Sequence, residues 1–188
     1  MEIKRDIIEK LKAWKENPRR KPLVLQGARQ VGKSWALKKF GKECFEDIVY
    51  INFDTMPALK EDFRRTKVPA QLIRQMEIMT GKPITPSSTL IILDEIQECN
   101  DALNSLKYFC EDANQYHVAV AGSRLGIMLH EGESYPVGKV DTLTMYPMTY
   151  EEFLLAKGRG QMVDLLQKGE WDVVKGLRSL YIQILREY

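Results

Sequence analysis

Residues 27–34 of this sequence read Gly27-Ala28-Arg29-Gln30-Val31-Gly32-Lys33-Ser34. Two glycines five positions apart, followed directly by Lys and Ser, form the pattern of a phosphate-binding loop, or P-loop. Glycines let successive backbone N–H groups turn inward around a polyphosphate. The Lys33 ammonium adds a positive charge for the phosphates, and the Ser34 hydroxyl offers a ligand to Mg²⁺ at the start of a helix. The alternative interpretation is a glycine-rich turn that binds nothing.

The sequence on either side of the loop predicts a strand before it and a helix after it. Leu23 to Leu25 form a short apolar run, and the residues from Trp35 to Phe40 are apolar at helical spacing. A strand–loop–helix arrangement is the setting that a phosphate-binding loop requires. We therefore predict that a nucleotide is bound by Gly27, Ala28, Arg29, Gln30, Val31, Gly32, Lys33, Ser34 and Trp35.

A second motif follows an uninterrupted apolar run. Residues 89–93 read Thr-Leu-Ile-Ile-Leu, which is typical of a central parallel strand buried on both faces. The next two residues are Asp94 and Glu95, and carboxylates at the end of a buried strand are costly unless something pairs with them. A Mg²⁺-bound triphosphate would do so, with Asp94 and Ser34 as metal ligands and Glu95 orienting or deprotonating the attacking water. The alternative is that Asp94 caps the following helix and Glu95 is solvated.

A further predicted strand, residues 48–54, carries polar residues at its end. Asn52 and Asp54 alternate there with apolar neighbours. Ligand crevices in open α/β sheets lie at strand ends, so both are possible site residues, although a turn or a cap is the more common role for Asn and Asp.

A fourth strand is predicted over residues 117–121, and it leads into Gly122, Ser123 and Arg124. We predict that Ser123 senses the γ-phosphate, with simple turn chemistry as the alternative. Arg124 either contacts phosphate or acts as an arginine finger, with an ordinary surface arginine as the alternative.

The two ends of the chain predict helices. Residues 3–16 are amphipathic and stop at Asn17-Pro18. A fifth strand is predicted over residues 138–145, and Thr149 with Glu152 then forms a capping box. The last helix is predicted to run from Val173 to Tyr188 with one apolar face, which either docks on this domain or meets a partner or a missing domain. The predicted domains are an N-terminal helix packed on the core (1–22), a P-loop core (23–148) and a helical extension (149–188).

Length and composition favour one globular domain. The 188 residues are 44% hydrophobic and 29% charged, which is enough for one sizeable core. There is no apolar run of about 18 residues and no leading apolar segment, so we expect a cytoplasmic protein that does not contact a membrane. Cys44, Cys99 and Cys110 have no paired spacing, and we expect reduced thiols rather than disulfides or a metal site.

Charge is unevenly distributed. Residues 1–42 carry 13 Lys and Arg against 4 Asp and Glu, a net charge of +9, whereas residues 43–112 have a net charge of −6. The run Arg19-Arg20-Lys21 is not needed by a phosphate-binding loop. It indicates either a nucleic-acid contact or a solvated basic face.

Taken together, four segments resemble an AAA-superfamily P-loop ATPase, and more narrowly the prokaryotic predicted ATPases that carry an uncharacterised C-terminal domain. The segments are GARQVGKS (27–34), LDEIQ (93–97), AGSRLG (121–126) and PVGKVDTLTMYPMTYEEF (136–153). The resemblance implies an α/β fold with a five-stranded, mostly parallel sheet, in which a sensor strand separates the Walker A and Walker B strands. It also implies ATP and Mg²⁺ as ligands, and catalytic roles for Lys33, Glu95 and Ser123. Members of this group are longer, so the resemblance also implies a further domain beyond this chain.

Three functions follow as hypotheses. The first is hydrolysis of Mg-ATP to ADP and phosphate, which would drive a molecular switch or motor. The second is a nucleotide-gated scaffold that binds ATP without hydrolysing it. The third is a DNA-associated ATPase, because of the basic N-terminal segment.

Overall fold

The computed structural model describes residues 4–122 and 136–188, and its centre is a five-stranded parallel sheet. The strands are β1 (Leu23–Gln26), β2 (Asp47–Asn52), β3 (Thr89–Asp94), β4 (His117–Ala121) and β5 (Asp141–Thr144). Their order is β2-β3-β4-β1-β5, and every neighbouring pair is parallel. The α/β fold, the five-stranded sheet and the position of β4 between β1 and β3 are as the family resemblance implies. Burial explains the two central apolar runs, because every residue of β3 and β4 is buried.

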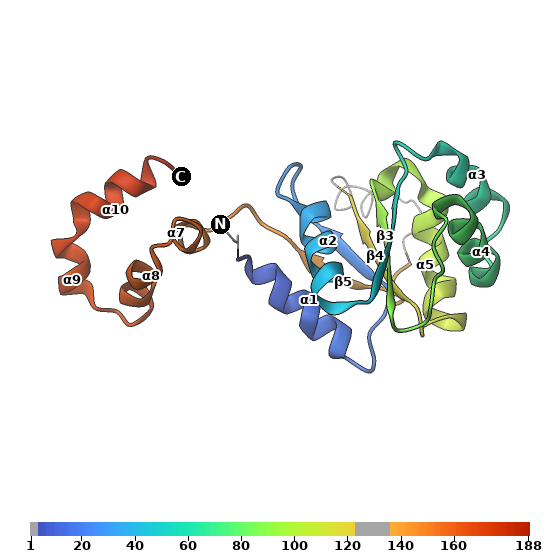
Figure 1. Ribbon diagram of the computed structural model, residues 1–188, viewed down its shortest axis with the longest axis horizontal. Helices are drawn as coiled ribbons and strands as arrows, with labels where there is room; N and C mark the ends of the chain where they lie inside the picture. The colour runs from blue at the N-terminus through green and yellow to red at the C-terminus, as the bar shows by residue number, and fades with distance from the viewer. Residues whose placement is uncertain (1–3, 123–135) are drawn as a thin grey trace.

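Helices cover both faces of the sheet, which makes three layers (Figure 1). On one face, α1 (Asp6–Glu16) and α2 (Lys33–Cys44) pack on a core that includes Leu23 and Ile92. The other face is covered by α3 (Pro57–Arg65), α4 (Pro69–Thr80) and α5 (Asn100–Asp112), over a core that includes Val24 and Leu93. Alternate side chains of each strand therefore point into the two cores, one on each face of the sheet. A short 3₁₀ turn, η1 (Ile96–Glu98), links β3 to α5.

The N-terminal helix α1 is anchored by its apolar face. It buries Ile7, Ile8, Leu11 and Trp14 against α2 and the sheet, as its helical spacing predicts. The indole Nε1 of Trp14 donates to the backbone oxygen of Lys21 at 2.9 Å. This contact fixes the turn that leads from α1 into β1.

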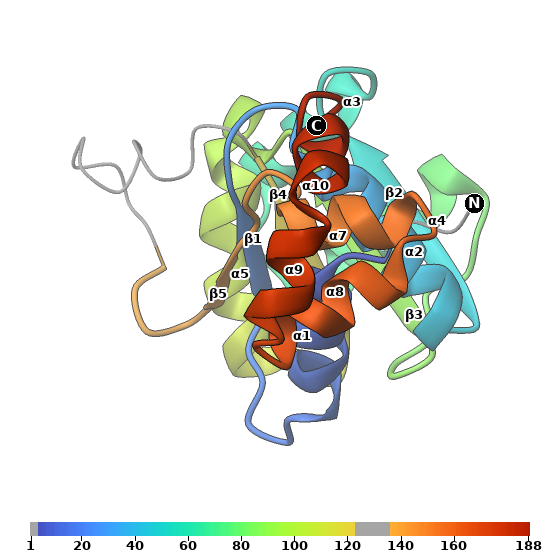
Figure 2. The ribbon, with the colours of Figure 1, turned by 90° about the vertical axis from the view of Figure 1, so that its left-hand side faces the viewer.

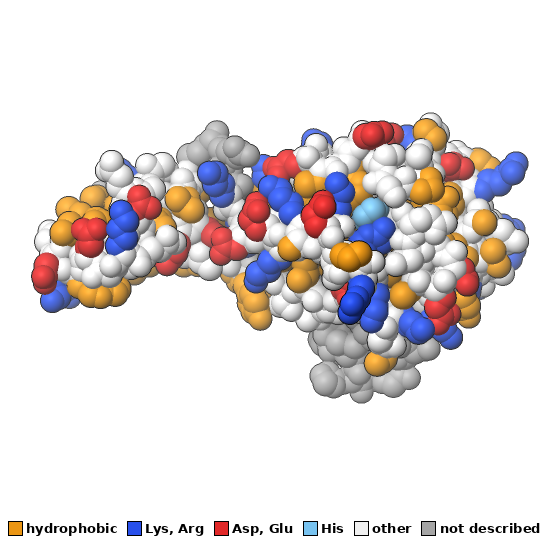
Figure 3. All heavy atoms as spheres, turned by 90° about the horizontal axis from the view of Figure 1, so that it is seen from below, with side chains coloured by type: hydrophobic (Ala, Val, Ile, Leu, Met, Phe, Trp, Pro, Cys, Tyr) orange, Lys and Arg blue, Asp and Glu red, His pale blue; other side chains and the backbone are white. Residues whose placement is uncertain are grey.

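Four short helices follow β5 and form what we call the C-terminal arm: α7 (Tyr150–Ala156), α8 (Gly160–Gln167), α9 (Trp171–Gly176) and α10 (Arg178–Leu185). The arm extends from the end of the molecule near the start of α1 (Figures 1 and 2). It has its own small core of Leu154, Met162, Val163, Tyr181 and Ile184. Its surface mixes hydrophobic and charged side chains (Figure 3). None of the described helices is long and apolar enough to cross a membrane.

The last helix of the sequence differs from its prediction. The prediction of a single helix from Val173 to Tyr188 is wrong, because the chain turns at Leu177 between α9 and α10. Gly176 immediately precedes the turn, and glycine is a poor helix former. The turn lets Tyr181 and Ile184 enter the small core, while Tyr188 stays exposed.

A buried ion pair joins the arm to α1. The Nε of Arg5 lies 3.0 Å from Oε2 of Glu152, and both side chains are almost fully buried. Oε1 of Glu152 accepts the backbone N–H of Asp6 at the start of α1, at 2.9 Å. The predicted capping box is also present, since Glu152 Oε2 accepts the Thr149 N–H and Thr149 Oγ1 accepts the Glu152 N–H. Glu152 thus caps two helices at once.

Candidate functional site

The phosphate-binding loop has a backbone that favours glycine at two points. Gly27 has a φ of 152° and Gly32 a φ of 95°, both disfavoured for residues with a Cβ. A Cβ on Gly27 would lie 2.1 Å from the backbone oxygen of Met145. Gln30 also has a positive φ, of 63°. Helix α2 begins at Lys33, directly after Gly32, so the loop ends at a helix N-terminus.

Lys33 is folded back onto this loop. Its side chain is buried, and Nζ donates to the backbone oxygens of Gly27 at 2.9 Å and Ala28 at 2.7 Å. Burial lowers the pKa of Lys33, while the negative charges of Glu95 and Asp94 act to raise it. The Lys33 ammonium thus donates its hydrogen bonds to two neutral carbonyl oxygens. The negative oxygens of a phosphate would accept these hydrogen bonds more strongly.

Asp94 lies at the end of β3 and is almost completely buried. Its Oδ2 accepts a hydrogen bond from the Tyr50 hydroxyl at 2.7 Å, and its Oδ1 accepts the backbone N–H of Glu95 at 3.0 Å. Burial, followed by this contact with Asp94, raises the pKa of Tyr50 to about 12, so the hydroxyl keeps its proton. Asp94 does not cap a helix, because η1 has Glu95 at its N-cap position and α5 begins at Asn100.

Glu95 stands in a left-handed backbone conformation, with φ 52° and ψ 46°. A residue with a Cβ pays about 1 kcal/mol or more for such a conformation, and residues of this kind concentrate at functional sites. The Gln97 amide Nε2 donates to Glu95 Oε2 at 2.5 Å, which holds the half-buried carboxylate beside the strand end.

These residues meet at one cavity of about 260 Å³, beside the carboxyl ends of the parallel strands. Its walls are Arg29, Gln30, Gly32, Lys33, Ser34, Trp35, Asp94, Glu95 and Gly122. The cavity therefore brings together the two sequence motifs, 60 positions apart in the chain. Of the other predicted residues, Gly27, Ala28 and Val31 belong to the loop but do not line the cavity, whereas Ser123 and Arg124 lie outside the described residues.

The chemistry of these side chains fits a hard cation that is shared with a phosphate. Ser34 and Asp94 offer a hydroxyl and a carboxylate on the same cavity, which are oxygen ligands of the kind that Mg²⁺ takes. Among the described residues there is no cluster of three or more His, Cys, Asp or Glu side chains that could hold a metal alone. A Mg²⁺ ion held here would complete its shell with phosphate oxygens and water.

Nothing in the sequence pattern indicates two contacts of the site, those of Tyr50 and Gln97. Tyr50 lies two residues before the end of β2, and β2 is the neighbour of β3, the strand that carries Asp94. A contact between Tyr50 and Asp94 can therefore be predicted only when the order of the strands is known. Asn52 fits the turn interpretation, since its Oδ1 accepts the Asp54 N–H at 2.8 Å. Asp54 is exposed and does not line the cavity.

The basic run at residues 19–21 is partly structural. Arg20 Nη1 donates to the backbone oxygen of Asn114 at 2.8 Å, and Lys21 Nζ donates to the backbone oxygen of Gly138 at 2.7 Å. Arg19 is exposed. Two of the three cations thus tie the start of β1 to neighbouring segments of the fold.

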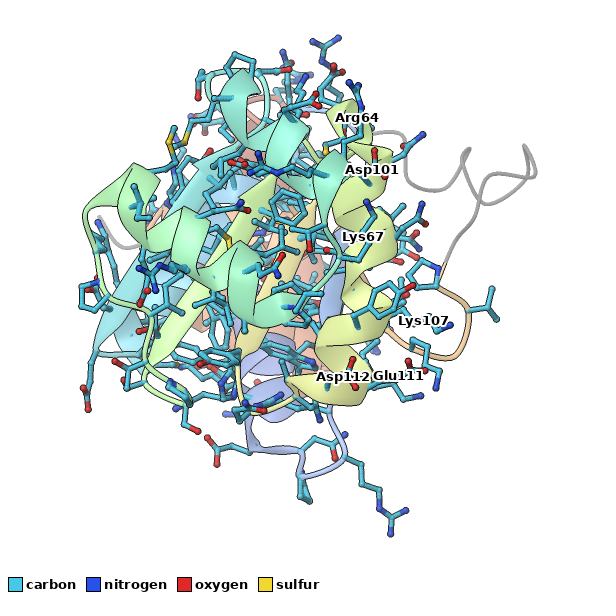
Figure 4. All side chains as sticks on the ribbon, turned by 90° about the vertical axis from the view of Figure 1, so that its right-hand side faces the viewer. Arg64, Lys67, Asp101, Lys107, Glu111 and Asp112 are labelled. Carbon is cyan, nitrogen blue, oxygen red and sulfur yellow. The ribbon has the colours of Figure 1, made fainter. Side chains whose placement is uncertain are left out.

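A larger cavity, of about 510 Å³, lies between α4 and α5 and contains no motif residue. It is lined mainly by apolar and aromatic side chains such as Ile73, Tyr108 and Tyr116. Charged residues spread along the outside of α5, and Lys67 lies close to Asp101, with an N–O distance of 2.8 Å (Figure 4). Size alone therefore does not identify the functional site.

Comparison with known proteins agrees with this architecture. The profile of a family described as an AAA domain matches residues 19–154. A Walker-type ATPase of Pyrococcus abyssi is similar in structure, with a TM-score of 0.53 and 16% identity over 99% of this chain and 76% of that one. A variant of RuvB from Thermotoga maritima has a TM-score of 0.52 and 17% identity over 88% of this chain and 52% of that one. At these identities, both likenesses show a common fold. No curated protein matches the sequence.

Proposed function

Because this chain belongs to the AAA-domain family, whose members are nucleotide-binding P-loop domains, we propose that it hydrolyses Mg-ATP to ADP and phosphate. The observation that carries the proposal is the shared cavity, where Lys33 and Ser34 at the start of α2 face Asp94 and Glu95 at the end of β3. A phosphate-binding loop alone would suit any phosphate ligand. A buried Asp followed by a Glu beside it is the combination that suits hydrolysis.

Each residue has a separate role in this proposal. The loop backbone and Lys33 hold the phosphates, and Ser34 and Asp94 hold Mg²⁺. The bound ion would neutralise charge on the phosphate oxygens. Glu95 orients a water molecule or takes its proton, which contributes roughly 10²- to 10⁴-fold in rate. Ser123 remains a predicted sensor of the γ-phosphate.

Phosphate release from Mg-ATP tests the proposal directly. Glu95→Gln and Lys33→Ala should each lower turnover by about two orders of magnitude or more, which is roughly 2.7 kcal/mol of barrier. Two matched controls should turn over like the wild type. Glu98→Gln changes an exposed carboxylate in η1, and Lys42→Ala changes an exposed lysine on α2.

The outcome also separates this function from a non-hydrolysing scaffold. If the wild type binds ATP but releases phosphate no faster than Glu95→Gln, the hydrolysis proposal fails and the scaffold is favoured. The exposed apolar side chains of the arm, Trp171, Val173 and Leu185, are the observation that supports a docking role for such a scaffold. If the wild type does not bind ATP, both functions fail.

DNA association needs its own test. Reversing the charge of Arg20 or Lys21 would break the structural hydrogen bonds described above, so Arg19→Glu is the cleaner variant. Salt-dependent DNA binding that Arg19→Glu weakens would support a DNA-associated ATPase. Absence of DNA binding by the wild type at low salt would contradict it.

A further inference from the structure

Tyr50 lies outside both motifs but contacts the carboxylate at the centre of the site. It is on β2, where its register partner is Ile92, and Asn52 is the partner of Asp94. Residues two apart on a strand face the same side of a sheet, so Tyr50 reaches Asp94 diagonally across the β2–β3 pair. The Tyr50 hydroxyl donates to Asp94 Oδ2 at 2.7 Å.

The tyrosine ring is itself held in place. Lys38 Nζ lies 3.5 Å from the centroid of the Tyr50 ring, a cation–π contact. Lys38 is on α2, one turn after Ser34, so the ring connects the helix that follows the phosphate-binding loop to the strand that carries Asp94. At the other end of the ring, the Asn52 side-chain amide donates to the Tyr50 hydroxyl oxygen at 3.5 Å. The amide uses an acceptor site of that oxygen, which leaves the hydroxyl proton for Asp94.

From the described residues, each oxygen of Asp94 receives one hydrogen bond. Oδ2 accepts from Tyr50, and Oδ1 accepts the Glu95 N–H. Two such bonds fix the rotation of the carboxylate, and each oxygen retains a lone pair for a metal ion or a metal-bound water. Ligand carboxylates in metal sites are held in this way, and loss of the outer contact typically weakens metal binding by 10- to 100-fold.

We propose that Tyr50 is a positioning residue for Asp94, and that its hydroxyl sets the affinity of the site for Mg²⁺ without contacting the nucleotide. This inference rests on the proposed function, because it takes Asp94 to be a ligand of the Mg²⁺ in Mg-ATP. The competing explanation is structural: Tyr50 only satisfies a buried carboxylate and stabilises the fold. The two explanations differ in what happens to metal binding when the protein is folded.

Tyr50→Phe removes the hydroxyl and keeps the ring. The test uses a Glu95→Gln background, so that ATP is not consumed, and compares this parent with the parent carrying Tyr50→Phe. ATP affinity is first measured by calorimetry in EDTA, and Mn²⁺ binding to the protein–ATP complex is then measured by electron paramagnetic resonance. We expect Tyr50→Phe to weaken Mn²⁺ binding by about 10- to 100-fold and to leave the metal-free ATP affinity within about 2-fold.

Tyr150→Phe is the matched control. It removes a tyrosine hydroxyl that donates at 2.8 Å to the backbone oxygen of Tyr181, within the arm, and it should change neither affinity. A second readout uses Tyr50→Phe with Glu95 intact. The Mg²⁺ concentration for half-maximal turnover should rise by a similar factor, and kcat at saturating Mg²⁺ should recover to within a few-fold.

Three results would overturn the inference. Equal Mn²⁺ affinity in the parent and Tyr50→Phe would show that the hydroxyl does not act on the metal. Equal losses of metal-free ATP affinity and Mn²⁺ affinity would favour the structural explanation. In both cases the proposed ATPase function stands, because the parent still binds ATP with metal. If the parent itself fails to bind Mn²⁺ with ATP, the proposed function and this inference both fail.

Discussion

At the scale of the single residue, Gly27 is the position in the loop that tolerates no side chain. Its φ of 152° and the 2.1 Å approach of a Cβ to the Met145 backbone oxygen both act against substitution. The Met145 backbone oxygen, unlike the end of a flexible side chain, cannot move aside without displacing the end of β5. The start of the loop is therefore set by the chain segment that follows β5.

Gly27→Ala should lower the free energy of unfolding by about 2 kcal/mol or more and weaken ATP binding. Gly138→Ala is the control, since Gly138 also has a positive φ, of 73°, but a Cβ there would meet nothing within 4 Å. That variant should cost about 1 kcal/mol and leave ATP binding unchanged. Urea unfolding and calorimetric ATP titration measure the two effects. Equal losses in both variants would contradict the steric explanation.

His117 gives the stability of the fold a pH dependence. Burial, and then the charges of Arg20 and Lys15, lower its pKa to about 4, below the usual value of about 6.5. The unfolded chain therefore binds more protons between these two values. The stability that comes from a neutral His117 is fully present above about pH 6.5, and it is lost as the pH falls towards 4, by at most about 3 kcal/mol.

Urea unfolding of the wild type and His117→Gln at several pH values tests this. The wild type should lose more stability than His117→Gln between pH 7 and pH 4.5, even if the variant is less stable at pH 7. Parallel curves for the two proteins would exclude His117 as the source of the pH dependence.

Single site residues can be predicted from the sequence where their motif is local. The loop at residues 27–34 and the pair Asp94-Glu95 could be predicted because each motif is continuous in the chain and follows an apolar run. The contact from Tyr50 to Asp94 could not, because it depends on β2 lying next to β3. No local pattern carries that information.

At the scale of the element, Glu152 determines how α7 and α1 meet. It accepts the N–H groups of Asp6 and Thr149 near the starts of these helices, and it pairs with the buried Arg5. Arg5 Nη2 donates in turn to the backbone oxygen of Tyr146 at 2.8 Å. Acidic side chains are favoured at helix N-termini, and here one carboxylate serves two.

Glu152→Gln should destabilise this junction by about 3 kcal/mol, because it leaves the Arg5 charge buried without its partner. Hydrogen exchange should show loss of protection at the first turns of α1 and α7. Glu151→Gln is the control, because Glu151 is exposed and accepts only from Gln167 in the described contacts, and its effect should stay within about 0.5 kcal/mol. The ion-pair explanation is rejected if the two variants behave alike.

Element prediction succeeded where the local signals were strong. The five predicted strands and the predicted capping box at Thr149 are present, with strand boundaries shifted by a few residues. The predicted helix from Val173 to Tyr188 is too long. Apolar residues at helical spacing continue through Gly176, but the buried residues lie in α10 and not in α9. Tertiary packing decides where such a helix is interrupted.

At the scale of the whole molecule, the sheet and the arm differ in how much apolar surface they bury. Large cores lie on both faces of the sheet, whereas five buried residues form the core of the arm. Regions with few buried apolar contacts open locally at a lower free energy than the global unfolding transition. The arm should therefore be the less stable part of the molecule.

Hydrogen exchange followed by mass spectrometry tests this difference. Amides in α8 to α10 should exchange at least about 100-fold faster than those in β3 and β4, which corresponds to roughly 2.7 kcal/mol. Similar protection in the arm and the central strands would mean that the whole chain unfolds as one unit.

The junction at Arg5 also has a consequence for the order in which the chain assembles. Arg5 Nη1 donates to the backbone oxygen of Val31 in the phosphate-binding loop, at 3.4 Å, and its ion-pair partner is Glu152. The companion hydrogen bond from the Asp6 N–H to Glu152 spans 146 positions. During synthesis Arg5 and Asp6 leave the ribosome long before residue 152 is made. We expect the phosphate-binding loop to gain its final support only after residue 152 has left the ribosome.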